Sequence, residues 1–315
     1  MANQHKEERP LETVGVIDIG TNSVRLVVAE VFPERRVHVL ERASLPVRLG
    51  QDTFVKRQLT RRSMNEAVAV LRGYREMLDT YRVDHIRAVA TSAVREANNA
   101  DAFLDRIFIS VGLDVEIIEP SEEIRLTVAA VRDSLGAKNL GKKHAIVLDV
   151  GGGSALLALL QRGETVSAGS YALGAIRLQE SLDTAGETPK RAVDMLRHQI
   201  GSVVDAICAT LPLQKVRTLI AVGGDARFAA EQIGTPGSRE HVHTMSSDDF
   251  DAFVAACEPY NPNELARKYK LELSAAETVV PALLVYQAVL HATNARTLTV
   301  SDVSMRDGLV LDLAR

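Results

Sequence analysis

Residues 145–160 read AIVLDVGGGSALLALL, and this stretch carries the main clue to the fold. An apolar run ends at Asp149, three glycines and Ser154 follow, and a second apolar run begins at Ala155. Two apolar runs separated by glycines are typical of buried strands joined by a turn. The turn is either a plain tight hairpin or a loop that holds a phosphate group, because glycine suits both.

A second copy of this pattern lies near the start of the chain, where residues 14–28 read VGVIDIGTNSVRLVV. The aligned pairs, all with the same separation, are Asp18 with Asp149, Gly20 with Gly151, and Ser23 with Ser154. One such loop is a weak signal. Two loops in the same register predict duplicated domains, each opening with a β-hairpin whose turn faces a common cleft.

The residue types of both loops suit a phosphate group and a hard cation. Consecutive N–H groups in a glycine turn form a concave nest for phosphate oxygens, and polar side chains add donors. Those side chains belong to Thr21, Asn22, Ser23 and Ser154. Asp18 and Asp149 would repel phosphate unless a divalent cation lies between them, and Mg²⁺ favours carboxylates together with phosphate oxygens. We therefore expect Mg²⁺ at Asp18 and Asp149.

The rest of the chain alternates between strand and helix patterns. Strand patterns such as 86–91 and 215–224 alternate with helical patterns such as 121–136. Ser121 is the expected N-cap of that last helix, so Glu123 lies in its first turn. This alternation predicts an α/β fold. A length of 315 residues fits two domains of ordinary size.

Composition argues against several functional classes. A formal net charge of −4 gives no basic field for nucleic acid. Cys208 and Cys257 lack the CxxC spacing of metal and redox motifs, which suits a reducing compartment. We find no apolar stretch that approaches the roughly 20 residues of a membrane span, and residues 1–10 lack the apolar core of a signal peptide. We expect a cytoplasmic protein that binds neither nucleic acid nor a membrane.

Several further motifs follow one another in a fixed order. They are IDIGTNSVRLVV at 17–28, VRLG at 47–50, ATSAVREANN at 90–99, SEEIRL at 121–126, LDVGGGS at 148–154, YALGAIRL at 171–178, AVGG at 221–224 and SMRDGLVLDL at 304–313. In this combination the chain resembles the exopolyphosphatase/guanosine-pentaphosphate phosphohydrolase (Ppx/GppA) family in its short two-domain form. The resemblance implies the actin-like ATPase fold, in which two ribonuclease-H-like domains enclose an interdomain cleft. We expect domain I at 1–125, with a C-terminal helix at 303–315 able to pack back on it, and domain II at 126–302.

The resemblance also implies an activity: Mg²⁺-dependent hydrolysis that releases terminal phosphate from inorganic polyphosphate or the 5′-phosphate of pppGpp. It assigns the role of general base to Glu123 and a phosphate contact to Arg95. The implied phosphate-binding residues are Gly20, Thr21, Asn22, Ser23, Arg95, Gly151, Gly152, Gly153, Ser154, Gly223 and Gly224, and the implied metal ligands are Asp18 and Asp149. The start of a helix favours an ionised carboxylate, as a base needs at neutral pH. Without the family motifs, Glu123 would be an ordinary complement to the helix dipole and Arg95 a solvated surface residue.

Some positions depart from the family pattern or leave two interpretations open. The family loop usually reads Gly-Gly-Gly-Ser-Thr-Glu, and here Leu156 replaces the glutamate that helps to hold metal or water. Leu156 either faces the cleft beside Ser154 or packs in the core beneath the hairpin. Asp225 stands where threonine is common, and it would either cap the following helix or repel phosphate. By strand alternation we expect Arg25 to point away from the first loop.

Three functions stay open at this point. The first is the phosphoanhydride hydrolase described above. The second is a weakly active or non-catalytic regulatory protein that binds guanosine tetraphosphate or polyphosphate in the same cleft. The third, an actin-fold kinase or ATPase, is disfavoured because the blocks TSAVREA and SEEIRL belong to the phosphatase pattern; the fold alone would not choose among them. The expected partners are inorganic polyphosphate or guanosine penta- or tetraphosphate, and a homodimer is left open.

Overall fold

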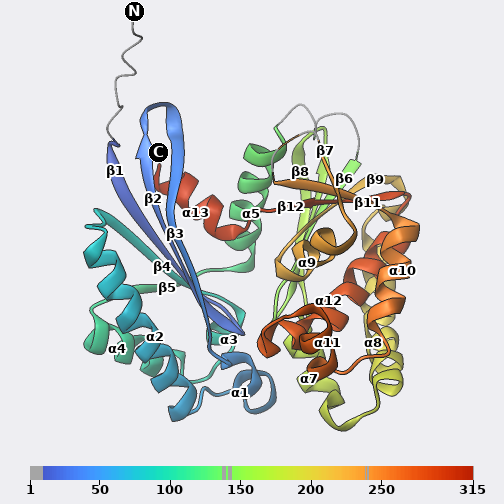
Figure 1. The fold of residues 1–315 in the computed structure, drawn as a ribbon, viewed down its shortest axis with the longest axis horizontal. Coiled ribbons are helices and arrows are strands. Elements are labelled where there is room, and N and C mark those ends of the chain that lie inside the picture. Colours follow the sequence, from blue (N-terminus) through green and yellow to red (C-terminus); the bar gives the residue numbers. More distant parts are fainter. Residues whose placement is uncertain (1–9, 137–139, 141–143, 238, 240, 315) are drawn as a thin grey trace, which may run out of the picture.

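The computed structural model of the protein has two α/β lobes that lie side by side, each built on one mixed sheet (Figure 1). The structure describes residues 10–136, 140, 144–237, 239 and 241–314. The expectations that fall on residues 1–9, including most of the segment examined for a signal peptide, lie outside the described residues, as does residue 315.

The sheet of the first lobe has the strand order β3-β2-β1-β4-β5. Its strands are β1 (Glu12–Ile19), β2 (Ser23–Phe32), β3 (Arg36–Pro46), β4 (His85–Ala90) and β5 (Val115–Ile117). β1 pairs antiparallel with β2 and parallel with β4. The predicted first hairpin is therefore present, with its turn between Ile19 and Val24.

The sheet of the second lobe has the order β10-β11-β12-β9-β6-β7-β8. Its strands are β6 (His144–Val150), β7 (Ala155–Gln161), β8 (Glu164–Tyr171), β9 (Val216–Val222), β10 (Thr235–Pro236), β11 (Val242–Ser246) and β12 (Thr297–Ser301). Read from β8, the order β8-β7-β6-β9-β12 repeats β3-β2-β1-β4-β5, and β6 pairs antiparallel with β7 and parallel with β9. The two sheets thus share one topology, as the paired sequence motifs predicted.

Helices cover both faces of the sheets. They are α1 (Leu49–Lys56), α2 (Arg61–Thr80), α3 (Ser92–Arg95), α4 (Ala100–Val111), α5 (Pro120–Leu135), α7 (Ala175–Leu182), α8 (Pro189–Thr210), α9 (Gly224–Ile233), α10 (Ser247–Cys257), α11 (Pro262–Tyr269), α12 (Leu273–His291) and α13 (Met305–Leu313), with short 3-10 turns η1 (Pro33–Arg35), η2 (Thr184–Gly186) and η3 (Leu213–Lys215). β7 is buried along almost its whole length because it is covered on both faces, which explains its unbroken apolar sequence.

Two helices lie between the lobes, and each follows the corresponding strand of the duplicated topology (Figure 1). α5 follows β5 and packs on the second sheet, whereas α13 follows β12 and packs on the first. The two helices touch closely, because a Cβ atom on Gly308 would lie 2.2 Å from the Leu126 carbonyl oxygen. Residue 125, the predicted domain boundary, falls inside α5, and that boundary stays a prediction.

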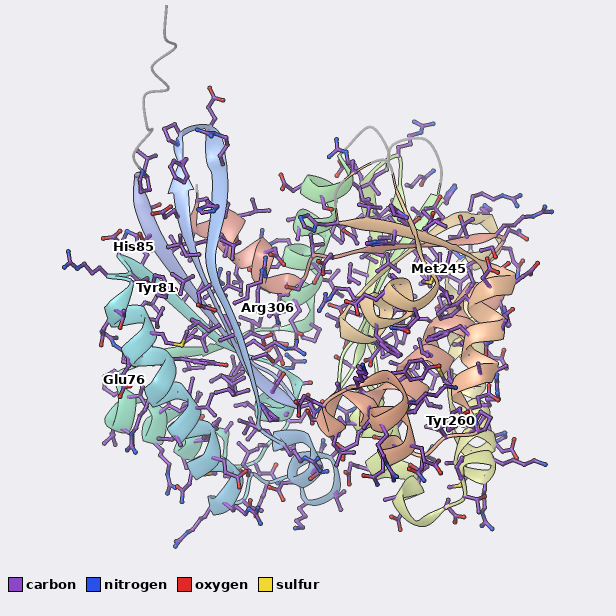
Figure 2. The ribbon with its side chains drawn as sticks, viewed as in Figure 1. Glu76, Tyr81, His85, Met245, Tyr260 and Arg306 are labelled. Carbon is purple, nitrogen blue, oxygen red and sulfur yellow. The ribbon has the colours of Figure 1, made fainter. Side chains whose placement is uncertain are left out.

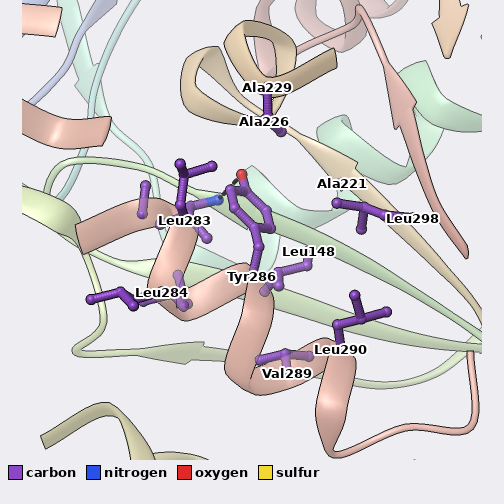
Figure 3. Close-up of a cluster of buried hydrophobic side chains, with 14 of the residues drawn as sticks. Leu148, Ala221, Ala226, Ala229, Leu283, Leu284, Tyr286, Val289, Leu290 and Leu298 are labelled. Carbon is purple, nitrogen blue, oxygen red and sulfur yellow. Dashed lines mark hydrogen bonds between the residues drawn. The ribbon is translucent and has the colours of Figure 1, made fainter. Parts of the chain in front are cut away.

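α12 forms the centre of the second core. Leu148, Leu283 and Leu290 surround Tyr286, whose side chain is fully buried (Figure 3). By length and hydropathy this helix would also be apolar enough to cross a membrane, so the expectation that no stretch approaches that length was wrong. The same helix is largely buried inside the lobe, which accounts for its apolar composition.

Candidate active site between the lobes

The two hairpin turns line one cleft of about 810 Å³ between the lobes. Each turn is closed by the same backbone hydrogen bond: the Gly20 N–H donates to the Ser23 carbonyl at 3.0 Å, and the Gly151 N–H donates to the Ser154 carbonyl at 2.9 Å. The predicted site residues that line the cleft are Asp18, Gly20, Thr21, Asn22, Ser23, Glu123, Asp149, Gly151, Gly152, Gly153, Ser154, Gly223 and Gly224. Residues far apart in the sequence thus converge on one cavity.

Two glycines of the second turn, Gly152 and Gly153, lie close to the first lobe. A Cβ atom on Gly153 would lie 2.2 Å from the Ser92 hydroxyl oxygen and 2.8 Å from the Thr21 hydroxyl oxygen. Those two hydroxyls are 3.1 Å apart, so the first turn, the start of α3 and the second turn meet at one point. Any side chain at Gly153 would push this junction apart.

A third turn, between β9 and α9, forms another wall of the cleft. Gly223 has a φ of 110°, a backbone conformation that favours glycine. The Tyr286 hydroxyl anchors the strand ends behind this wall, because it accepts a hydrogen bond from the Val150 N–H at 3.1 Å and donates one to the Val222 carbonyl (Figure 3). The strands that carry Asp149 and Gly223 therefore end at fixed positions.

Asp225 also lines the cleft. One of our two expectations for it, that it caps the following helix, was wrong. Gly223 is the N-cap of α9, and Asp225 lies in the first turn. Its carboxylate accepts a hydrogen bond from the Thr278 hydroxyl at 2.9 Å. Burial raises the pKa of Asp225 to about 6, although Thr278 and nearby arginines oppose this shift.

Glu123 points into the cleft from the first turn of α5, and its side chain is enclosed: the residue is 6% exposed. The helix begins at Pro120 with Glu119 as its N-cap, so the expected cap at Ser121 was wrong. Proline is favoured at the first helical position because it has no N–H to satisfy. Arg95 Nη1 donates to Glu123 Oε1 at 2.7 Å.

Burial raises the pKa of Glu123 to about 7, and the opposing effect of Arg95 does not cancel it. The helix start therefore does not keep this carboxylate fully ionised at neutral pH, contrary to our expectation. Arg95 itself is not among the residues that line the cleft. The same Nη1 that holds Glu123 also donates to the Ile118 carbonyl at 2.6 Å, so the observed contacts of Arg95 hold the carboxylate in place.

Three arginines converge on the cleft from different elements. Arg25 lies directly across the ladder from Asp18, on the same face, so the expectation that it points away was wrong. Arg306, at the start of α13, lies between the lobes and donates from Nη1 to Asp18 Oδ2 at 2.9 Å (Figure 2). Desolvation and the nearby Arg306 lower the pKa of Arg25 to about 10. Arg227 on α9 completes the group, with its Nε 3.1 Å from Asp302 Oδ1.

Asp149 and Leu156 occupy opposite positions in the β6–β7 ladder, so their side chains share one face of the sheet. Burial raises the pKa of Asp149, whereas Arg227, Arg25 and Arg306 oppose that shift. Leu156 is 7% exposed and belongs to the apolar cluster under α5, where its neighbours include Ile124 and Val128, and it also borders the cleft. Leu156 therefore packs in the core, as one interpretation predicted, and also borders the cleft, as the other predicted.

A family model described as the Ppx/GppA phosphatase family matches residues 26–315. The chain belongs to this family. Exopolyphosphatase 1 of Mycobacterium leprae is 26% identical over 302 residues, which cover 95% of this chain and 88% of the relative. A guanosine-5′-triphosphate,3′-diphosphate pyrophosphatase of Aeromonas salmonicida is 25% identical over 301 residues, covering 94% of this chain and 58% of the relative.

Solved structures of the Ppx/GppA type share the fold. An exopolyphosphatase from Cytophaga hutchinsonii superposes with a TM-score of 0.86 at 24% identity, over 96% of this chain and 98% of that one. A Ppx/GppA family member from Aquifex aeolicus gives a TM-score of 0.76 at 24% identity, over 96% and 97% of the two chains. The predicted fold class, two ribonuclease-H-like domains of the actin-like type, is confirmed.

Sequence reasoning missed the cleft positions of Arg227 and Arg306 and misplaced Arg25. Arg306 lies within the motif SMRDGLVLDL, which helped to identify the family but was given no role at the site. Arg227 has no such signal, because only the fold brings the start of α9 next to Asp149 and Arg25. Local sequence patterns cannot predict that side chains so far apart in the chain meet at one cleft.

The donor set fits a Mg²⁺ ion that arrives with phosphate. Among the described residues, no group of three or more His, Cys, Asp or Glu side chains could hold a metal ion. Asp18 and Asp149 both line the cleft, and one oxygen of Asp18 is already bound by Arg306. Mg²⁺ commonly takes one or two carboxylates and completes its shell with water and substrate phosphates. The two aspartates suit that mode, whereas an all-protein cage is not formed by the described residues.

Proposed function

We propose that the protein is a phosphoanhydride hydrolase that removes terminal phosphate from inorganic polyphosphate or the 5′-phosphate from pppGpp. The observation that carries the proposal is Glu123, a buried carboxylate with a pKa near 7 that faces a cleft lined by two matched glycine turns. A base with a pKa near the working pH suits proton transfer from water. Membership of the Ppx/GppA phosphatase family, and the names of the relatives given above, support the same substrates.

In the proposed reaction, the N–H groups of the two turns and the hydroxyls of Thr21, Ser23 and Ser154 bind the terminal phosphate. The oxygen of a water molecule attacks the terminal phosphorus, its proton passes to the Glu123 carboxylate, and the bridging P–O bond breaks. The leaving oxygen stays with the shortened chain, and inorganic phosphate is released. Arg95 holds Glu123 in the orientation that this step needs.

We also propose Mg²⁺ at Asp18 and Asp149, where it would neutralise phosphate charge. Local charge supports this assignment. The residues that line the cleft include six acids and three arginines, namely Asp18, Glu123, Asp149, Asp225, Glu231 and Glu272 with Arg25, Arg227 and Arg306, while Arg95 pairs with Glu123 outside this lining. A polyanion therefore meets a site with no large excess of positive charge, and an added divalent cation would favour its binding.

A second candidate is a regulatory protein that binds the same anions and hydrolyses them slowly or not at all. The residue that favours it is Leu156, an apolar side chain directly opposite Asp149 where the resemblance implies a carboxylate. For either candidate we propose a cytoplasmic location. Two unpaired cysteines, Cys208 exposed and Cys257 buried, are consistent with a reducing compartment.

The deciding experiment measures phosphate release from tripolyphosphate, long-chain polyphosphate and pppGpp side by side, across a range of Mg²⁺ concentrations. Glu123→Gln serves as the matched control because it keeps the shape of the side chain. We expect its turnover to fall by about 10²- to 10⁴-fold with little change in substrate affinity. Binding without release in the wild-type protein would favour the regulatory candidate, and near-normal turnover in the variant would remove Glu123 from the mechanism.

A further inference from the structure

The start of α7 is fused to the second glycine turn by backbone contacts. The N–H groups of Ala175 and Ile176 donate to the carbonyls of Gly151 and Gly152, each at 2.9 Å. A Cβ atom on Gly174 would lie 2.2 Å from the carbonyl carbon of Gly153, so the two segments are in direct contact. The turn and the first residues of α7 must therefore move together.

From that position the side chain of Arg177 reaches across to the first lobe. Its Nε donates to the Gly153 carbonyl at 2.6 Å. Its two terminal nitrogens donate to the two carboxylate oxygens of Glu96, with Nη1 and Oε2 3.0 Å apart. The guanidinium lies 4.0 Å above the centre of the Phe54 ring, and the side chain is 16% exposed. The bidentate pair with Glu96, the stacking on Phe54 and the low exposure together hold the Arg177 side chain in one orientation.

Glu96 connects this contact to the proposed base. It is the residue after Arg95 and forms the C-cap of α3. Arg95 in turn binds Glu123 at 2.7 Å. One short path of contacts therefore runs from the Gly153 carbonyl through Arg177 and Glu96 to Arg95 and Glu123, and it crosses the boundary between the lobes.

We propose that Arg177 is a positioning residue that keeps the second glycine turn in register with Glu123 across the interface. The inference rests on the proposed function, in which that turn holds the transferred phosphate and Glu123 accepts the proton. Positioning supplies much of the catalysis in phosphoryl transfer, and a misplacement of about 1 Å can cost roughly 10²-fold in rate. Loss of Arg177 should therefore reduce kcat more than it weakens substrate binding.

The lobes are also joined by a contact that does not touch this path, which provides a matched control. Arg48 Nη2 donates to Glu277 Oε1 at 3.0 Å, again from the first lobe to the second. Arg48 contacts neither Arg95 nor the second glycine turn in the hydrogen bonds and ion pairs of the described residues. If Arg177 served only to hold the lobes together, Arg48→Gln and Arg177→Gln would have similar effects.

The kinetic test uses tripolyphosphate as substrate. We expect Arg177→Gln and Glu96→Gln each to lower kcat by about 10- to 100-fold while KM changes by less than about threefold. Arg177→Lys should recover part of the loss in kcat. The kcat of the double variant, Arg177→Gln with Glu96→Gln, should be no lower than that of the less active single variant, because both changes break the same link. Normal kcat in a folded Arg177→Gln protein, or an equal loss in Arg48→Gln, would overturn the proposal. If Arg177→Gln does not fold, Glu96→Gln decides by the same criteria.

A second measurement needs no activity. Amide hydrogen exchange on the free proteins should become faster at residues 91–97 and 150–156 in Arg177→Gln, and it should stay at the wild-type rate there in Arg48→Gln. Unchanged exchange in both segments would refute the positioning role even if turnover fell. If exchange is faster in Arg177→Gln but the wild-type protein hydrolyses none of the substrates, the proposed function is rejected. The structural link between the two segments is then still supported.

Discussion

Replacing Glu123 with glutamine is expected to slow turnover and, at alkaline pH, to make the fold more stable. The residue is 6% exposed, and burial raises the pKa of its carboxyl group to about 7, whereas the ordinary value is 4.5. Above pH 7 the folded protein must therefore hold an ionised carboxylate in a place that disfavours the charge. Glutamine has nearly the same shape, resembles the protonated acid and never ionises.

The size of the effect follows from the two pKa values. A pKa of about 7 in the folded state and 4.5 in the unfolded state corresponds to roughly 3 kcal/mol. Because the folded pKa is the higher one, wild-type stability falls as pH rises from 4.5 to 7, and the loss is complete above pH 7. The advantage of Glu123→Gln should thus be roughly 3 kcal/mol at pH 8 and less than about 1 kcal/mol at pH 5.

Urea denaturation of both proteins at pH 5, 6, 7 and 8 measures this difference directly. Glu122→Gln is a control of opposite sign, since hydrogen bonding to Arg125 lowers the pKa of Glu122 and its ionised form stabilises the fold. In the active protein, kcat should rise with pH through about 7 as Glu123 loses its proton. A stability difference that does not change with pH, or a wild-type protein more stable than Glu123→Gln at pH 8, would refute this account of a buried base.

Substitutions at three further positions address the rest of the cleft. Asp149→Asn should weaken Mg²⁺-dependent binding of tripolyphosphate by about tenfold or more, measured by calorimetry with and without the metal; an unchanged Mg²⁺ dependence would contradict the assignment. Leu156→Glu should lower stability by about 2–4 kcal/mol, because it places a charge in the core beneath α5, whereas Leu156→Met should cost less than about 1.5 kcal/mol; equal melting temperatures for the two would contradict core packing. Arg227→Gln should weaken tripolyphosphate binding about tenfold in EDTA, while Arg217→Gln, at an exposed position on β9, should leave it unchanged; equal effects would deny Arg227 a direct role.

The two hairpins were predictable because their information is local. Apolar runs on either side of an aspartate and glycines give both the strands and the turn, and the repeated register predicts the duplication. The start of α5 was predicted wrongly because two sequence signals compete there. Ser121 is a good N-cap residue, but Pro120 is favoured inside the first turn and moves the helix start upstream.

The electrostatics of the cleft could not be read from the sequence, because they depend on burial and on distant neighbours. Glu123 was expected to be ionised at a helix start, yet burial raises its pKa to about 7 in spite of Arg95. Arg25 seemed to point away until the ladder placed it opposite Asp18. Arg306 reaches Asp18 only because α13 returns to the first sheet from the far end of the chain.

Charge around Asp149 is arranged differently here from the arrangement that the family loop implies. The position opposite Asp149 in the ladder holds the apolar Leu156, while the first turns of α9 bring an acid, Asp225, and a base, Arg227, to the same cleft. Asp225 is tied to Thr278 and buried so that its pKa is raised, which limits the negative charge it adds near pH 6. Arg227 opposes the raised pKa of Asp149 and adds a guanidinium that can meet phosphate oxygens. In this cleft Leu156 stands where the family loop implies a carboxylate, so one metal ligand is lost, while Arg227 supplies a cation that attracts a phosphate chain. We therefore expect binding of the anion to depend less on Mg²⁺ than hydrolysis does.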